Sequence, residues 1–145
     1  MITLITGIPM SLKTITAMKM GLNQALPVYT NIVDNTGDQS FLPKSFLKIP
    51  DDDWTLIQES AFIIYDSCEY IPEFTARFKN DSPRLKDLLL HRHFGKNHLN
   101  HNIVFIFQHE KFANLLIRQL ANEHINLNTD MLAYNSARLF LENRD

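Results

Sequence analysis

The chain has few of the features that mark secreted or membrane proteins. It contains a single cysteine, Cys68, so no disulfide can form within the chain, which fits a reducing compartment. No stretch approaches the ~20 continuous apolar residues of a membrane helix. The apolar N-terminus lacks the basic flank, the longer apolar core and the small-residue cleavage site of a signal peptide. We therefore expect a cytoplasmic protein.

The chain also has no large excess of positive or negative charge. The formal net charge is −2, from 14 basic and 16 acidic residues that are interspersed along the chain. Proteins whose main ligand is a nucleic acid usually carry clustered positive charge, so we do not expect direct nucleic-acid binding. The sequence also lacks internal repeats and low-complexity linkers, and 145 residues suit one domain, so we expect a single domain over residues 1–145.

A glycine is absent where the most informative motif of the chain requires one. Residues 7–14 read GIPMSLKT, directly after the apolar run 2–6 and before a helix-like stretch. In the P-loop pattern G-x-x-x-x-G-K-[ST], Gly7, Lys13 and Thr14 match, but Leu12 replaces the second glycine. Backbone N–H groups of such a loop surround a phosphate, the lysine contacts the outer phosphate oxygens, and the threonine ligates Mg²⁺. The alternative is a chance match after a buried strand.

Leu12 predicts a weakened loop. A leucine forced to positive φ would cost roughly 1–2 kcal/mol, and its side chain would compete for the phosphate space. We expect the fold of a P-loop protein to persist better than tight ATP binding. The residues expected to contact ATP are Gly7, Pro9, Ser11, Lys13 and Thr14.

Strand-like apolar runs alternate with helical or irregular segments. They cover residues 2–6, 27–32, 61–66 and 102–108. This alternation predicts an α/β fold with a mainly parallel sheet. Together with the loop motif, it leads us to expect the P-loop NTPase type, with three layers (α/β/α) and with the first, third and fourth runs as neighbouring strands. The continuous runs AFIIYD and NIVFIF are typical of strands buried on both faces.

Helices are predicted between these strands. The periodicity indicates helices over 13–24, 85–92 and 112–123, the last with an apolar stripe of Phe112, Leu115, Leu116 and Leu120. We expect residues 33–53 to be mostly loop, with a short helix near 42–47.

The tail 129–145 could form a helix or a strand. Thr129 or Asp130 would cap the helix, and Leu132, Leu139 and Leu141 would lie on an apolar surface.

An aspartate ends the third apolar run, as in a Walker B segment. The strand FIIYD would carry Asp66 to the edge of the sheet beside the loop, where it would hold Mg²⁺ together with Thr14. The next residue is Ser67, at a position where ATPases often carry a glutamate that activates water. Glu69 would have to reach back to replace it, and the sequence favours a solvated loop carboxylate instead.

Two further residues are candidates for catalysis. Gln108 closes the fourth run, where its side chain would lie between the loop and Asp66 and touch a γ-phosphate or the attacking water; His109 follows it. The alternative is that both merely end a strand. Arg118 would act in trans as a phosphate-contacting arginine in an oligomer, with a surface salt bridge as the favoured alternative.

Four histidines lie within the segment HRHFGKNHLNH at 91–101, which raises the hypothesis of a transition-metal site. No cysteine or acidic residue lies within the segment to complete a tetrahedral ligand set. Ordinary polar loop roles for His91, Arg92 and His93 are favoured.

Taken in order, several segments resemble the N-terminal domain of zonular occludens toxin and the related filamentous-phage morphogenesis proteins. They are MITLITGIPMSLKT, PVYTNI, FIIYDSCEYIP, HRHFGKNHLNHNIVFIFQH, IRQL and EHI, over residues 1–126. The most specific are VYTNI and the HRH-G segment with its downstream strand ending in QH. The resemblance implies a cytoplasmic P-loop NTPase domain of an inner-membrane protein that powers phage assembly and export, with Lys13 and Thr14 on phosphate and Mg²⁺ and Asp66 as the Walker B residue.

The chain departs from the family at Met10 and Leu12, which replace glycines, and at Ser67, which replaces glutamate. The resemblance therefore implies a phage-assembly domain with weakened or lost hydrolysis, whose partners are copies of itself, homologous subunits or other assembly and export components. The alternatives are an active ATPase with an atypical loop and a regulatory module that acts on an active homologue. The membrane-spanning and periplasmic parts of the family are absent from this sequence, so contact with the inner membrane is expected only through them.

Overall fold

The described residues in the computed structural model are 1–9, 12–79, 82–94 and 99–127; the side chains of 91–94 are not among them. They form one six-stranded sheet in which every pairing is parallel. Its order is β3-β2-β4-β5-β1-β6, from strands β1 (Ile2–Thr6), β2 (Val28–Thr30), β3 (Phe46–Lys48), β4 (Phe62–Tyr65), β5 (Asn102–Phe107) and β6 (Glu123–Asn126). The predicted neighbours β4, β5 and β1 are adjacent, so this prediction is confirmed.

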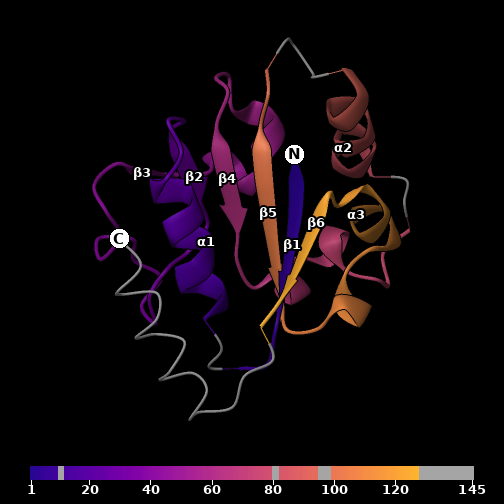
Figure 1. The fold of residues 1–145 in the computed structure, drawn as a ribbon, viewed down its shortest axis with the longest axis horizontal. Helices are drawn as coiled ribbons and strands as arrows, with labels where there is room; N and C mark the ends of the chain where they lie inside the picture. Colours follow the sequence, from indigo (N-terminus) through magenta and orange to yellow (C-terminus); the bar gives the residue numbers. More distant parts are fainter. Residues whose placement is uncertain (10–11, 80–81, 95–98, 128–145) are drawn as a thin grey trace.

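Helices cover both faces of the sheet (Figure 1). Helix α1 (Lys13–Leu22) packs on one face, against apolar residues such as Ile5 and Ile64. Helices α2 (Pro83–Phe94) and α3 (Leu115–Leu120) pack on the other face, where the larger core cluster includes Leu85 and Ile117. This arrangement confirms the three-layer α/β/α fold.

The continuous apolar strands are buried on both faces, as their sequences predict. In β4, Ile63 and Tyr65 face the cluster under α2 and α3, whereas Phe62 and Ile64 face the cluster under α1. Successive side chains of a strand point to opposite faces, so a strand with a helix layer on each side has no solvated face and needs no polar alternation.

One predicted element is corrected at one edge of the sheet. No helix forms near 42–47; β3 adds to β2 instead, with Val28 opposite Phe46. Three consecutive aspartates, Asp51, Asp52 and Asp53, lie in and directly after the short 3₁₀ turn Pro50–Asp52, and Trp54–Leu56 forms a second turn. Local composition suggested a loop, but pairing with β2 gives the backbone of β3 hydrogen-bond partners.

The predicted helix 112–123 is wrong in its bounds. Glu110–Phe112 is a 3₁₀ turn, α3 has 6 residues, and Glu123–Asn126 joins the outer edge of β1 as β6. The predicted apolar stripe is only partly correct, since Leu120 is buried while Leu115 is 48% exposed.

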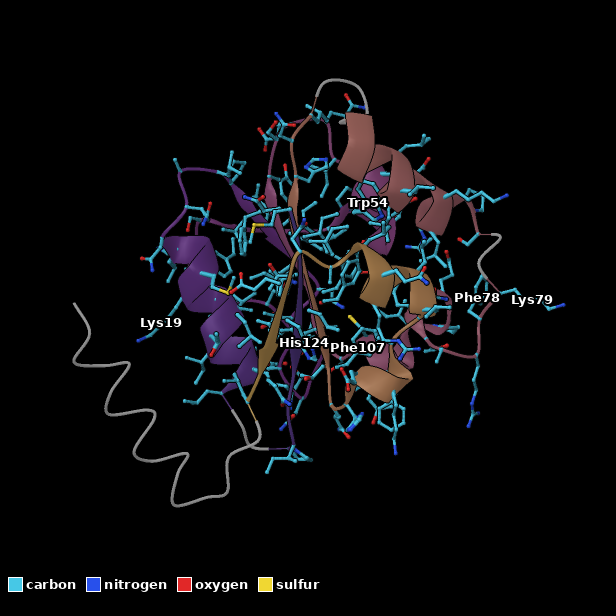
Figure 2. All side chains as sticks on the ribbon, turned by 45° about the vertical axis from the view of Figure 1, so that its right-hand side comes forward. Lys19, Trp54, Phe78, Lys79, Phe107 and His124 are labelled. Atoms are coloured by element: carbon cyan, nitrogen blue, oxygen red, sulfur yellow. The ribbon has the colours of Figure 1, made fainter. Side chains whose placement is uncertain are left out.

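The outer strand β6 is also held by a side chain. His124 (Figure 2) lies 2.8 Å through its Nε2 from the hydroxyl of Thr6, the last residue of β1. At the periphery, Lys19 of α1 and Lys79 point outward on opposite sides of the molecule (Figure 2).

The predicted elements of the tail 129–145 lie outside the described residues. Among the helices that the structure describes, none is long and apolar enough to cross a membrane.

Candidate phosphate-binding site

Three loops meet at the carboxyl edge of the sheet, at the bottom of Figure 1. They follow β1, β4 and β5, and β5 lies between the other two strands. The N–H of Gly7 donates a hydrogen bond to the carbonyl of Gln108 over 3.3 Å, which joins the loop after β1 to the end of β5. Helix α1 begins at Lys13, so the N–H groups of its first turn face the same edge.

Leu12 is not strained. It precedes α1 with φ −88° and ψ 27°, and only 4% of its surface is exposed. Its carbonyl accepts the N–H of Thr16 over 2.8 Å, as the start of a helix requires. The expectation of a leucine held at positive φ is therefore wrong, because the chain enters the helix at this residue with ordinary backbone angles and the side chain is buried.

Lys13 holds the loop in shape. Its Nζ donates to the carbonyls of Gly7 over 2.6 Å and of Ile8 over 2.8 Å. Burial lowers the pKa of Lys13, and the negative charges of Glu69 and Asp66 oppose that effect. Lys13 therefore contacts the loop residues and lies within electrostatic range of two carboxylates.

Thr14 and Asp66 come together as the sequence predicts. The hydroxyl of Thr14 donates to Oδ2 of Asp66 over 3.3 Å, and Oδ1 of Asp66 accepts the N–H of Ser67 over 2.9 Å. Burial raises the pKa of Asp66, while these two hydrogen bonds and the charge of Lys13 pull it down.

The pair of oxygens from Thr14 and Asp66 fits a hard cation such as Mg²⁺, which takes few protein ligands and completes its shell with phosphate and water. The described residues contain no cluster of three or more His, Cys, Asp or Glu side chains placed to hold a metal. A site with two protein oxygens therefore depends on a phosphate ligand.

Asn31 is a site residue that the sequence reasoning did not name. Its Oδ1 accepts the backbone N–H of Asp66 over 2.7 Å, and its Nδ2 donates to the backbone carbonyl of Asp66 over 3.0 Å. The neighbouring Thr30 hydroxyl donates to the carbonyl of Ile64 over 3.0 Å. Asn31 belongs to the VYTNI segment, whose resemblance to the family is the sequence signal for this position.

The residues after Asp66 take an unusual path. Ser67 has φ 53°, in the left-handed region, and the chain then makes the 3₁₀ turn Cys68–Tyr70. This turn brings Glu69 back toward the sheet, where its Oε2 atom is buried without a hydrogen-bond partner among the described residues. The expectation of a solvated loop carboxylate is wrong for this oxygen.

Gln108 directly follows β5, between the strands that lead to the Lys13 loop and to Asp66. It is exposed and lines a pocket of about 660 Å³ together with Glu69. The ring of His109 accepts the N–H of Lys111 through Nδ1 over 3.0 Å and so caps the next turn.

Other candidates lie elsewhere or are not described. Arg118 is exposed in the last turn of α3, on the face opposite α1, so one chain does not gather it with Lys13 and Asp66. Pro9 is exposed next to Gly7 and Ile8 in the loop, while Ser11 lies outside the described residues.

Of the four clustered histidines, only His101 has a described side chain. It is buried at the opposite edge of the sheet, where its Nδ1 accepts the N–H of Ala61 over 3.2 Å. The metal-site hypothesis for residues 91–98 lies outside what the structure describes.

This strand order, with β5 inserted between the strand of the lysine loop and the strand of the aspartate, defines a P-loop NTPase-like α/β fold. Two solved structures share it. The N-terminal domain of zonular occludens toxin from Neisseria meningitidis has a TM-score of 0.63 and 21% identity, over 89% of this chain and 77% of that one. The genome packaging NTPase B204 of Sulfolobus turreted icosahedral virus 2 was solved with ATP-γS. It has a TM-score of 0.63 and 14% identity, over 97% of this chain and 84% of that one.

By sequence, the chain is 35% identical over 133 residues to the putative assembly protein ORF301 of Pseudomonas phage Pf3. The matched residues make up 88% of this chain and 42% of that protein, so the chain spans less than half of its relative. No family model matches the sequence. The resemblance to phage assembly proteins and to the zonular occludens toxin domain is thus confirmed, the first by sequence and the second by fold.

Proposed function

We propose that this chain is the nucleoside-triphosphate-binding domain of a phage assembly protein, with weakened hydrolysis. The observation that carries the proposal is the meeting of the Thr14 hydroxyl with Asp66 at the start of α1, beside the loop that Lys13 holds. A lysine, a hydroxyl and a carboxylate in this order are the parts that P-loop NTPases use for phosphates and Mg²⁺.

The comparisons support both parts of this proposal. The relative from phage Pf3 is described as an assembly protein, and the packaging NTPase with the same fold was solved with an ATP analogue. ATP with Mg²⁺ is accordingly the proposed ligand. Copies of the chain, homologous subunits and other assembly or export components are the proposed partners, and the cytoplasm is the proposed location.

Weakened hydrolysis is proposed because of the residue after Asp66. Ser67 has no group that accepts a proton at neutral pH, so the proton acceptor would have to come from another position, and loss of a well-placed general base usually lowers a rate by roughly 10²–10⁴. A fully active ATPase is the second candidate. It gains support from Leu12, whose ordinary backbone angles remove the strain that would have argued against a working loop.

The proposal predicts specific phosphate binding that depends on Lys13. Titration of the chain with a fluorescent ATP analogue in Mg²⁺ should give saturable binding, and Lys13→Ala should weaken it at least tenfold because the cation facing the phosphates is removed. Lys19→Ala, on the outward face of α1, is the matched control and should bind like the wild type. Equal binding by the wild type and the Lys13 variant would contradict the proposal.

A further inference from the structure

One carboxylate oxygen of Glu69 is buried without a hydrogen-bond partner among the described residues. Within the part of the chain that the structure describes, Oε2 accepts no hydrogen bond although it is shielded from solvent. Native proteins give almost every buried polar atom a partner, so an exception points to a ligand, a bound water or a catalytic function.

The surroundings of Glu69 point toward the phosphate-binding edge. Its charge acts on Lys13, and among the charges that raise the pKa of Lys13 it ranks before Asp66. Glu69 also lines the same pocket as Gln108, which stands between the P-loop and Asp66 at the end of β5. A carboxylate and an amide therefore share one pocket, and the carboxylate lies within electrostatic range of the lysine of the loop.

The backbone explains how a glutamate at this position reaches the site. The left-handed Ser67, with φ 53°, turns the chain sharply after Asp66, and the 3₁₀ turn that follows is closed by a hydrogen bond of 3.0 Å from Tyr70 N–H to the Ser67 carbonyl. Below this turn, the buried thiol of Cys68 donates to the carbonyl of Tyr65 over 3.2 Å. The turn is thus anchored at the end of β4, and it carries Glu69.

We propose that Glu69 is the general base of this domain and replaces the glutamate that is missing at Ser67. This inference rests on the proposed nucleotide site. In the step, a water oxygen forms a bond to the γ-phosphorus, the bond between that phosphorus and the β,γ-bridging oxygen breaks, and the proton of the water passes to the Glu69 carboxylate. The products are nucleoside diphosphate and inorganic phosphate, with Gln108 orienting the water.

The test compares Glu69→Gln with the wild type in three measurements. These are the binding of ATP with Mg²⁺, the single-turnover rate of ATP hydrolysis at saturating enzyme, and the thermal unfolding midpoint without nucleotide. An amide cannot accept the proton, so the rate should fall by about 10² or more. Binding should not weaken, and ATP rather than ADP should be recovered from the complex. The unfolding midpoint should not fall, because the carboxylate makes no described hydrogen bond.

Glu123→Gln is the matched control, since Glu123 is exposed at the start of β6, where it lies opposite Thr3 at the other end of the strands. An unchanged rate in Glu69→Gln would overturn the inference, as would a lowered midpoint with a proportionate loss of binding, which would show a structural role. Binding by the wild type without any detectable hydrolysis would overturn the inference and leave the proposed binding function intact. Absence of ATP binding by the wild type would overturn the proposed function itself.

Discussion

Asn31 fixes the position of Asp66 through the backbone. Its amide side chain both donates to and accepts from the main chain of Asp66. These two hydrogen bonds fix the Asp66 backbone so that the carboxylate lies beside Thr14. The two hydrogen bonds leave the Asp66 carboxylate free to accept from Thr14 and Ser67. Asn31 therefore acts as a positioning residue for Asp66.

This role predicts two separate effects of Asn31→Ala. Loss of both hydrogen bonds should lower the free energy of unfolding by roughly 1–3 kcal/mol, and the freed Asp66 should bind Mg²⁺ less well, so the Mg²⁺-dependent part of ATP affinity should decline. Urea unfolding and ATP titration with and without Mg²⁺ measure the two effects. Asn35→Ala, on an exposed loop, should change neither. A stable variant with unaltered Mg²⁺ dependence would show that Asn31 does not position Asp66.

Leu12 and Ser67 illustrate why single residues were hard to judge from the sequence. The cost expected for Leu12 assumed a backbone angle that the chain does not adopt, whereas Ser67, which raised no such concern, has the left-handed backbone. Backbone angles depend on how the flanking strand and helix are joined, and a residue list does not contain that information. The positions of Lys13, Thr14 and Asp66 could be predicted because each directly follows or begins a strongly patterned element.

At the scale of elements, α1 lies very close to the sheet. A Cβ on Gly21 would stand 3.1 Å from Cγ2 of Val28 in β2 and 3.3 Å from Cδ1 of Phe62 in β4. These are side chains of the core, fixed by neighbours on both sides. The glycine therefore permits the close approach that sets the position of α1, which carries Lys13 and Thr14 at its other end.

A larger residue at Gly21 should push α1 away from the sheet. We expect Gly21→Leu to lower the free energy of unfolding by about 1–3 kcal/mol, because overpacking outweighs the better helix propensity of leucine. The urea midpoint measures this loss. Leu22→Ala, one residue further along and 54% exposed, should shift stability by less than about 0.5 kcal/mol. A Gly21→Leu variant as stable as the wild type would mean that Val28 of β2 and Phe62 of β4 can shift to make room for the larger side chain.

The elements that the sequence missed are the two edge strands. Both β3 and β6 are short, with 3 and 4 residues, and their side chains are mostly exposed. Neither carries the continuous apolar run that identified β4 and β5, since only one face of an edge strand packs against the core. Their strand conformation comes from hydrogen bonds to β2 and β1, which are contacts between distant parts of the chain.

At the scale of the whole molecule, Arg84 joins three segments that are far apart in the sequence. It forms an ion pair with Glu73, donates to the carbonyl of Asp52 over 2.9 Å, and lies with its guanidinium carbon 5.6 Å from the centre of the Phe74 ring. Ser82, next to the start of α2, also hydrogen-bonds to Glu73. The hydrogen bond from Arg84 is the largest cause that lowers the pKa of Glu73.

The lowered pKa of Glu73 makes its ion pair with Arg84 sensitive to acid. The folded state holds Glu73 ionised more strongly than the unfolded chain does, so its stabilisation is complete above the usual glutamate pKa and is lost as pH falls through the folded value. We expect the wild type to exceed Glu73→Gln in free energy of unfolding at pH 7. The gap should narrow as the pH drops below the usual glutamate range.

Urea unfolding measures this difference in free energy of unfolding at a series of pH values, from 7 down to the lowest pH at which the protein is still folded. Glu123→Gln serves as the control and should follow the wild-type curve throughout. A constant gap between the wild type and Glu73→Gln at every pH would show that the pair with Arg84 contributes by packing alone.

The sequence by itself determined the parallel α/β sheet, the three central strands and the placement of Lys13, Thr14 and Asp66 at one edge of that sheet, because buried strands and the elements that follow them are encoded locally by apolar runs and a short motif. The tertiary structure decided the edge strands, the ordinary backbone angles of Leu12, the hydrogen bonds of Asn31 to Asp66 and the electrostatic interaction of Glu69 with Lys13. Each of these depends on contacts between segments that lie far apart in the chain, and their distances and hydrogen bonds are fixed only when the sheet has assembled.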